Sequence, residues 1–487
     1  MSSGDRLLDP GVTCWRVERA DRFAWIVDGA DYFRHCKAAM LRAHHRITLI
    51  GWDFDTRIAL ERGGKTLPGP NQLGVFLSWM LWKRPALEIV LLKSNLRLLS
   101  VFDDIWYGTI PTSVLNRLST KRIHFAVDGA HPTGSVHHQK IVVVDDKLAF
   151  CGGIDLTMDR WDTREHSNEN RLRRGLGRGY GPRHEVAVVV DGAAAAALAE
   201  LARERWRTAT GRSLRPVKAD HTVWPSGVEP VLCDIEIGIA RTLPQLAGRG
   251  EVREVEALNV AAISAARDII YLENQYLASR ALAEELARRL RDPEGPEIVM
   301  VLPRRSESRL EKQSMDSARY RLLQMLWAAD SHQRLGVYWP VTAAGKPIYV
   351  HSKVLLVDDR LLRVGSSNLN NRSMGFDSEC DLAVEADPSA REHLTIRQKI
   401  ASLRNQLLGE HLGVSGKYFE RVVQQRGSVL AAIEALRGEG RTLRRFTERT
   451  VADESSLLAE NDLMDPDRVP RSLTGSVQRW LEGFTRH

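Results

Sequence analysis

The residues best suited to chemistry in this sequence form one pattern that occurs twice. The stretch HHQKIVVVDDKLAFCGGID (137–155) matches VHSKVLLVDDRLLRVGSSN (350–368). The aligned residues that could react or bind an anion are His138 with His351 and Lys140 with Lys353. Histidines, with an ordinary pKa of about 6.5, can divide the roles of nucleophile and acid at neutral pH. Lysines can bind phosphoryl oxygens, so this set suits phosphodiester cleavage.

The repeat extends beyond these four residues. The further aligned pairs are Asp145 with Asp358, Gly152-Gly153 with Gly365-Ser366, and Asp155 with Asn368. A single His-x-Lys-x4-Asp pattern is weak, because three fixed residues recur by chance in long chains. Two copies with the same glycine-containing continuation favour a functional site. The structural alternative is a pair of half-buried hairpins whose polar ends are merely solvated.

Each copy is predicted to form a β-hairpin. Histidine and lysine two residues apart point to the same face of a strand. The motif aspartate lies about 23 Å from its histidine along an extended strand, so the two cannot touch. We therefore expect Asp145 and Asp358 to close the turns by accepting hydrogen bonds from backbone amides at the far end of each hairpin.

The length of the turn sets the register of each hairpin. With a two-residue Asp-Asp turn, His138 pairs with Gly153, and Asp155 lies on the face of the histidine. The corresponding residues of the second copy are His351, Ser366 and Asn368. A three-residue turn would break this pairing; we predict the shorter one.

The elements that must position these residues alternate between short apolar strands and helices. The alternation restarts after a segment rich in Pro, Gly and polar residues, 211–230. This predicts an α/β protein with two units of similar plan, residues 1–215 and 225–415. Residues 416–487 are predicted to form a helical C-terminal extension.

Composition sets broad limits on location and partners. The chain has 487 residues and a formal net charge of +7, which suits an anionic partner without selecting phosphate, nucleic acid or a membrane. Five cysteines without ligand spacing argue against disulfides and a structural zinc site. No secretory signal and no apolar run of about 18 residues is visible, so we expect a cytoplasmic protein. FLSWMLWKR (76–84) has the composition of an interfacial helix, although such a stripe more often packs on a sheet.

The duplicated motif resembles that of the phospholipase D superfamily, His-x-Lys-x4-Asp-x6-Gly-(Gly/Ser)-x-(Asn/Asp). Three further stretches resemble its phosphatidylcholine-hydrolysing branch: GGIDLTMDRWDT (152–163), YLENQYL (271–277) and LLGEHLG (407–413). The resemblance implies two similar α/β/α halves, a pseudo-dimer, with the active site at their interface. The candidate catalytic residues are then the six motif residues His138, Lys140, Asp145, His351, Lys353 and Asp358.

The resemblance also implies residues that orient the histidines or bind phosphate. Acidic residues are expected beside the histidines in the regions of Asp162 and Glu379; the alternatives are a helix cap and a solvated loop acid. Ser366 and Asn368 can donate hydrogen bonds, and Asp155 occupies the position equivalent to Asn368. Glu273, Asn274 and Gln275 either line the pocket or make structural hydrogen bonds. We expect no metal and no cofactor, because the sequence shows no ligand cluster.

The function implied is hydrolysis of a glycerophospholipid to phosphatidic acid and an alcohol, through a phosphohistidine. Water or an alcohol would be the acceptor, and peripheral contact with a membrane surface is left open. The nearest alternative is a phosphatidyltransferase similar to cardiolipin synthase. A nuclease is less favoured, so nucleic acid is not an expected partner. The resemblance favours His138 as nucleophile and His351 as acid, whereas the motif itself is symmetric.

Overall fold

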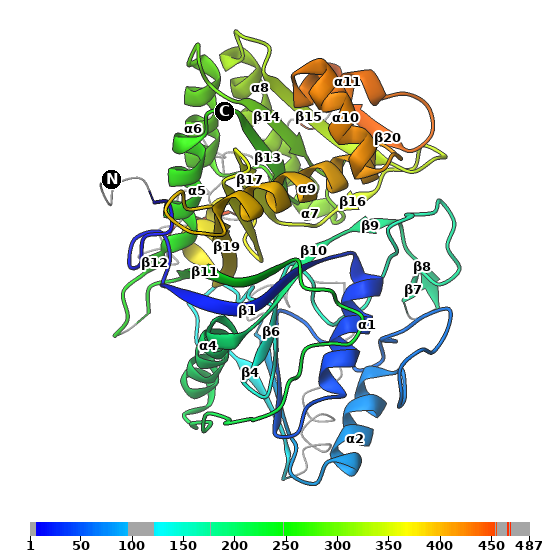
Figure 1. Cartoon of the computed structure of the whole chain (residues 1–487), viewed down its shortest axis with the longest axis vertical. Coiled ribbons are helices and arrows are strands. Elements are labelled where there is room, and N and C mark those ends of the chain that lie inside the picture. Colours follow the sequence, from blue (N-terminus) through cyan, green and yellow to red (C-terminus); the bar gives the residue numbers. More distant parts are fainter. Residues whose placement is uncertain are drawn as a thin grey trace, which may run out of the picture.

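One large mixed sheet organises the protein. The computed structural model describes residues 6–95, 121–175, 177–246, 248–452, 454, 465, 466 and 468. Sixteen strands form the main sheet, and helices lie on both of its faces (Figure 1). The α/β class expected from the sequence is confirmed.

The strand order repeats on the two sides of the sheet. From the centre outward, the first half contributes β1 (Arg16–Val27), β10 (Val186–Asp191), β6 (Leu148–Gly152), β5 (Ile141–Val144), β2 (Arg46–Gly51), β3 (Glu88–Ser94) and β4 (Ile123–Asp128). The second half contributes β11 (Leu232–Leu243), β19 (Glu379–Glu385), β18 (Leu361–Gly365), β17 (Val354–Val357), β13 (Ile269–Glu273), β14 (Glu297–Val301) and β15 (Leu335–Val341). Among these seven strands, the last two pairs of each half are parallel.

Antiparallel pairing of β1 with β11 joins the halves into a continuous sheet. The pairing runs from Arg16 opposite Ile239 to Phe23 opposite Leu232. The segment 211–230 contains no helix or strand, in agreement with its predicted lack of periodicity. Short strands lie outside the main path: β12 (Val252–Arg253) pairs with β11, β9 (Arg183–His184) with β16 (Tyr349–Val350), and β7 (Arg174–Gly175) with β8 (Arg178–Gly179).

Helices cover both faces of the sheet and bury its apolar strands. In the first half, α4 (Gly192–Thr210) packs on one face, and α1 (Gly29–Met40) and α2 (Leu73–Lys83) on the other. In the second half the corresponding layers are α9 (His393–His411), α10 (Gly416–Arg426) and α11 (Val429–Leu436) against α5 (Glu254–Ala265), α6 (Arg280–Arg291) and α8 (Ser317–Ala329). Because the motif strands are covered on both sides, all residues of β5 and β17 are buried.

The motif hairpins differ from the predicted register by one residue. Val144 pairs with Leu148, and Val357 pairs with Leu361, so each connection is a three-residue turn. Both aspartates of each Asp-Asp pair have φ between 51° and 53°, and the residue after them donates its N–H back to the last strand residue. Asp tolerates this left-handed conformation, but the third residue of each turn shifts the strand pairing. The predicted two-residue register was therefore wrong.

The first aspartate of each turn binds the neighbouring strand instead of the catalytic motif. The buried carboxylate of Asp145 accepts from the N–H groups of His44, His45 and Arg46 at 2.6–2.8 Å, where β2 begins. Asp358 accepts at the same distances from three consecutive amides where β13 begins. These carboxylates hold amides of the adjacent strand and not of their own turn. Asp145 and Asp358 were predicted to be catalytic residues. Their contacts instead hold the strands together, so we correct their role to a structural one.

The segment expected to be a helical extension also contributes a strand. After α10 and α11, β20 (Thr442–Arg445) pairs with β15 and extends the second half of the sheet beyond the seven-strand repeat. It is followed by the short helix α12 (Glu448–Val451). Residues 416–451 are therefore not purely helical, and most of the predicted extension after 452 lies outside the described residues. The predicted domain boundaries stay a prediction.

The Trp-rich stretch 76–84 falls mainly on α2. Its Phe76, Leu77 and Met80 side chains are buried in the core of the first half. Trp82 is 76% exposed on the opposite side of this helix. The helix thus packs on the sheet, which is the alternative that the sequence analysis favoured for this stretch. Among the described helices, none has the length and apolar character needed to cross a bilayer.

Replacing Asp145 with Asn should weaken the fold. The carboxylate satisfies three backbone donors, and an amide group cannot replace both of its oxygens as acceptors. We expect Asp145→Asn to lower the free energy of unfolding by about 2 kcal/mol or more, measured by urea unfolding. Asp359→Asn is the matched control, because Asp359 has the same positive φ in the other hairpin and makes a partly exposed ion pair with Arg404. Equal losses in both variants would contradict this prediction.

Candidate active site

Each motif histidine is fixed by a backbone hydrogen bond to the opposite half of the protein. His138 lies three residues before β5, and its N–H donates to the carbonyl of Ser378 at 2.9 Å. His351 lies three residues before β17, and its N–H donates to the carbonyl of His184, also at 2.9 Å. Since Ser378 belongs to the second half and His184 to the first, the segments before the two motifs cross between the halves.

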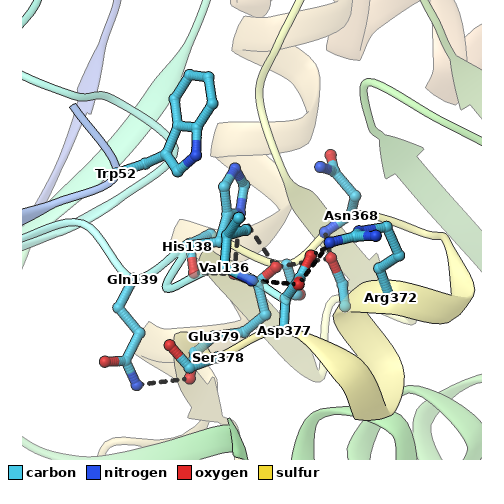
Figure 2. Close-up of polar contacts among 12 residues, drawn as sticks. Trp52, Val136, His138, Gln139, Asn368, Arg372, Asp377, Ser378 and Glu379 are labelled. Atoms are coloured by element: carbon cyan, nitrogen blue, oxygen red, sulfur yellow. Dashed lines mark hydrogen bonds and ion pairs between the residues drawn. The ribbon is translucent and has the colours of Figure 1, made fainter. Parts of the chain in front are cut away.

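The acceptor residue in each case is followed by a glutamate that contacts the histidine side chain. Nδ1 of His138 lies 3.0 Å from Oε1 of Glu379, as Figure 2 shows. Nδ1 of His351 lies 2.8 Å from Oε1 of Glu185. Both glutamate side chains are fully buried. Each pair therefore combines a histidine from one half with a carboxylate from the other.

The motif lysines lie beside the histidines, although the register differs from the predicted one. Nζ of Lys140 is 3.0 Å from the carbonyl of His138 and 3.2 Å from a carboxylate oxygen of Asp155. Nζ of Lys353 is 2.6 Å from the carbonyl of His351 and 3.1 Å from Oε1 of Gln275. Side-chain exposure is 2% or less for both lysines. Their charges are thus held close to where an anion would contact the histidines.

Gly153 shows that the two motifs meet. A Cβ atom on Gly153 would lie 3.1 Å from Cδ of Lys353 and 3.2 Å from the carbonyl oxygen of His351. It would also come within 3.3 Å of Glu185. Glycine therefore lets the end of the first hairpin pack against the second motif, and a larger residue here would push the two halves apart.

Burial and the lysines set the protonation of the site. Burial, followed by Lys140 and Lys353, holds the pKa of His138 well below its usual value. The pKa of His351 is also well below its usual value, because the side chain is buried and lies near cations that include Lys353 and Lys140. Because a histidine with a low pKa is neutral at pH 7, an Nδ1–H donated to the glutamate leaves Nε2 with a free electron pair. Such a nitrogen can attack phosphorus or take a proton.

Hydroxyl groups and Asn368 surround the Glu379 pair. Ser366 and Ser373 donate to Glu379 at 2.5 and 2.6 Å, and Ser373 Oγ accepts the N–H of Asn368. Burial raises the pKa of Glu379 to about 8, and the two hydroxyl donors oppose that rise. The carboxamide oxygen of Asn368 is buried without a hydrogen-bond partner, so the side chain is available to a ligand.

Asp162 does not contact a motif histidine, although the sequence places it near one. Its carboxylate binds His166 Nδ1 at 3.0 Å and Arg173 at 3.2 Å. The carboxylate beside His351 belongs instead to Glu185, which sequence reasoning missed. The signal was present, because Glu185 begins the apolar run EVAVVV just as Glu379 begins a strand of its own. The longer segment 156–184 concealed this equivalence.

The stretch Glu273-Asn274-Gln275 has two roles. Gln275 accepts from Lys353 and donates to the hydroxyl groups of Tyr276 and Tyr349, so it borders the site. Glu273 and Asn274 are fully buried and make structural hydrogen bonds. His137 binds Ser378 and Asp128 and is not paired with a motif lysine, in keeping with its predicted place as a neighbour.

Known proteins share both the sequence pattern and the fold. Residues 260–400 match a family described as cardiolipin synthase, PLD-like domain. Phospholipase D alpha 1 of Zea mays is 24% identical over 81% of this chain and 66% of its own length. Phospholipase D2 of Bos taurus is 22% identical over 79% of this chain and 52% of its own length. The chain thus spans only about half to two thirds of these relatives.

A solved structure supports the fold independently of sequence. The phosphatidylserine synthase of Haemophilus influenzae Rd KW20 superposes with a TM-score of 0.54 at 13% identity. The match covers 79% of this chain and 87% of that one. At this identity the likeness concerns the fold.

Removing the charge of Lys140 should raise the pKa of His138. A neighbouring cation disfavours the imidazolium, so Lys140→Met should move that pKa upward. The measurement is an NMR titration of the imidazole Cε1–H, assigned by its absence in His138→Gln. Lys147→Met is the control, because this lysine lies in the distant turn of the same hairpin. A pKa that stays in place, or falls, in Lys140→Met would refute the electrostatic assignment.

Proposed function

The chain belongs to the phospholipase D superfamily, and we propose that it cleaves glycerophospholipids into phosphatidic acid and a free alcohol. The observation that carries this proposal is the pair of crossed histidine–glutamate contacts with a buried lysine beside each histidine. Such a site offers a nucleophile, a proton donor and positive charge to one phosphodiester. The names of the maize and bovine relatives support the same class of reaction.

The first step forms a covalent intermediate. Nε2 of His138 attacks phosphorus, forming a P–N bond while the P–O bond to the headgroup alcohol breaks. His351, protonated on Nε2, gives that proton to the departing oxygen. Lys140 and Lys353 stabilise the negative charge on the remaining phosphoryl oxygens. Bound phosphate also favours the imidazolium form of His351, because a nearby anion raises a histidine pKa.

The second step releases the phosphatidyl group. Neutral His351 takes a proton from water while the water oxygen attacks phosphorus, and the P–N bond to His138 breaks. The product is phosphatidic acid, and the site returns to its starting protonation. An alcohol in place of water gives a new phosphatidyl ester by the same exchange. His138 is assigned as the nucleophile from the family resemblance, and its side chain is also the more exposed, at 16% against 6% for His351.

A phosphatidyltransferase similar to cardiolipin synthase is the second candidate. The family description matched by residues 260–400 names that enzyme, and the structural neighbour is a phosphatidylserine synthase. The chemistry would be the same, with an alcohol favoured over water as acceptor. The difference between the candidates is therefore the acceptor and not the catalytic residues.

The substrate class can be tested by identifying products. We expect phosphatidic acid from vesicles of phosphatidylcholine or phosphatidylglycerol, and a phosphatidyl ester when a primary alcohol is added. Lys353→Ala should lose about a hundredfold or more in rate while keeping its circular dichroism spectrum. Cardiolipin from phosphatidylglycerol, with little phosphatidic acid, would select the second candidate. Cleavage of single-stranded DNA without any lipid turnover would overturn both.

The roles of the two histidines can be separated by trapping the intermediate. A p-nitrophenyl phosphodiester has a good leaving group and hardly needs an acid. His351→Ala should therefore still load phosphate onto His138 but release it slowly. His138→Ala should form no adduct with any substrate. Mass spectrometry of rapidly quenched protein locates the label, and an adduct on His351 of the unaltered protein would reverse the assignment.

The pH dependence should respond to the hydroxyl donors of Glu379. Ser373 hydrogen-bonds the ionised carboxylate and so lowers its pKa, which burial has raised to about 8. Ser373→Ala should raise that pKa further. Because ionised Glu379 holds the Nδ1 proton of His138, the rising limb of kcat/KM should move to higher pH. Ser135→Ala, which removes a buried hydroxyl donated to a backbone carbonyl, should leave the profile in place. A shift to lower pH would contradict the role of Glu379.

A further inference from the structure

A second cluster of buried ionisable side chains lies behind the active site. Four side chains from separate segments of the chain converge there, and their exposed fractions are 6% or less: Asp28, His166, His184 and Glu410. Its link to the active site is direct, because His184 precedes Glu185 and accepts the N–H of His351. The proposed reaction gives this cluster no role.

The spacing of the facing atoms, which include both carboxylate oxygens of Asp28, is close to that around a tetrahedral ion. Nε2 of His166 lies 3.4 Å from Oδ2 of Asp28 and 3.3 Å from Oε1 of Glu410. Nδ1 of His184 lies 3.3 Å from Oδ1 of Asp28 and 3.6 Å from the same Glu410 oxygen. Ligands at about 2.0–2.1 Å from a tetrahedral centre are about 3.3–3.4 Å apart. The distances of 3.3–3.4 Å match that spacing, the fourth is 3.6 Å, and all are longer than good hydrogen bonds.

The same atoms are buried and have no hydrogen-bond partner. This holds for Oδ2 of Asp28, Nε2 of His166, Nδ1 of His184 and Oε1 of Glu410. A buried polar atom without a partner is costly, so four such atoms in one cluster call for an explanation. They offer two imidazole nitrogens and two carboxylate oxygens to that point, a donor set suited to zinc.

Each histidine is oriented by a further carboxylate on its other nitrogen. Nδ1 of His166 is 3.0 Å from Asp162, and Nε2 of His184 is 3.0 Å from Glu273. Histidines that bind metal commonly donate their second N–H to a carboxylate in this way, which fixes the tautomer and the ring plane. Asp162, Glu273 and Glu410 come from the three stretches that the sequence analysis singled out beyond the motifs, 152–163, 271–277 and 407–413.

The backbone of two members is held in uncommon conformations. Asp28 has φ 68° and ψ 154°, a region that residues other than glycine rarely adopt, and His166 has φ 42°. The next residue, Gly29, allows no side chain, because a Cβ there would lie 1.9 Å from the carbonyl oxygen of Arg160. Backbone strain of this kind persists only where surrounding contacts enforce it.

We propose that Asp28, His166, His184 and Glu410 bind one Zn²⁺ that stabilises the fold next to the active site. The ion contacts no substrate, because the four ligand side chains are at most 6% exposed and none belongs to the motif. Its task is to tie the start of α1, the segment 162–184 and the end of α9 together. The carboxylate of Glu410 is oriented by Arg164, whose Nε donates to Oε2 at 2.6 Å. Arg441 lies 3.5 Å from the other oxygen, Oε1.

The test is metal analysis of the full-length protein, purified without a polyhistidine tag and without chelator. Inductively coupled plasma mass spectrometry should find about one zinc per chain. X-ray absorption at the zinc edge should show only nitrogen and oxygen ligands, at about 2.0–2.1 Å. Removal of the metal by dipicolinate should lower the Tm, and added Zn²⁺ should restore it. These measurements need no variant and no assay of activity.

Variants locate the ion. His166→Asn should abolish stoichiometric zinc, whereas His35→Asn, which alters another buried histidine in α1, should retain it. His411→Asn should also retain zinc; its loss there, with retention in His166→Asn, would assign the ion to His184, Glu273 and His411 and overturn the proposed ligand set. Wild-type protein that contains no zinc and whose Tm does not rise when Zn²⁺ is added would overturn the site altogether. The cluster would then be a network of histidinium and carboxylate ions.

Discussion

The crossed contacts between histidine and glutamate are the constraint on which the rest of the structure depends. His138 takes its carboxylate from β19 of the second half, and His351 takes its carboxylate from the residue before β10 of the first half. Neither half alone can orient its own histidine. Two features hold the halves so that both contacts can form. They are the pairing of β1 with β11 and the close packing of Gly153 against Lys353. A repeated fold thus yields one site and not two.

Burial gives this site its chemical character. A charge removed from water is costly unless it is paired, and the site places histidines, lysines and glutamates in the interior. Burial lowers the pKa of Lys353 and of both histidines and raises the pKa of Glu379. Lys140 has the carboxylate of Asp155 beside it, whereas Lys353 contacts a carboxamide and a carbonyl oxygen, so a phosphodiester anion would add negative charge next to Lys353. The site is therefore better suited to binding an anion than to remaining empty, which agrees with the proposed substrate class.

The sequence reveals the α/β plan and the motif residues because both repeat. Glu379 was indicated by the family resemblance, whereas Glu185 was missed, because the segment 156–184 separates it from its motif. The hairpin register was missed because a third turn residue, Lys147 in the first hairpin, is not predictable from the Asp-Asp pair alone. Local pattern predicts elements well, but a one-residue shift in pairing depends on tertiary contacts.

The sequence analysis could not find the buried cluster of Asp28, His166, His184 and Glu410. Its four proposed ligands have no common spacing, since Asp28 and Glu410 come from nearly opposite ends of the chain. The expectation that the chain lacks a metal-ligand cluster came from adjacent Cys and His spacing, which detects only ligands that are close in sequence. Three-dimensional convergence is invisible to such a search.

The surroundings of the two catalytic pairs differ although the motifs are alike. Glu379 is held by hydroxyl groups of its own half, Ser366 and Ser373. Glu185 has instead a backbone N–H bound by Asp28 at 3.0 Å and is preceded by His184, so its position follows that of the buried cluster. A rigid cluster would fix Glu185, and through it the ring of His351. The inserted segment therefore gives one half a support that the other half does not need, and a symmetric motif acquires two unequal histidines.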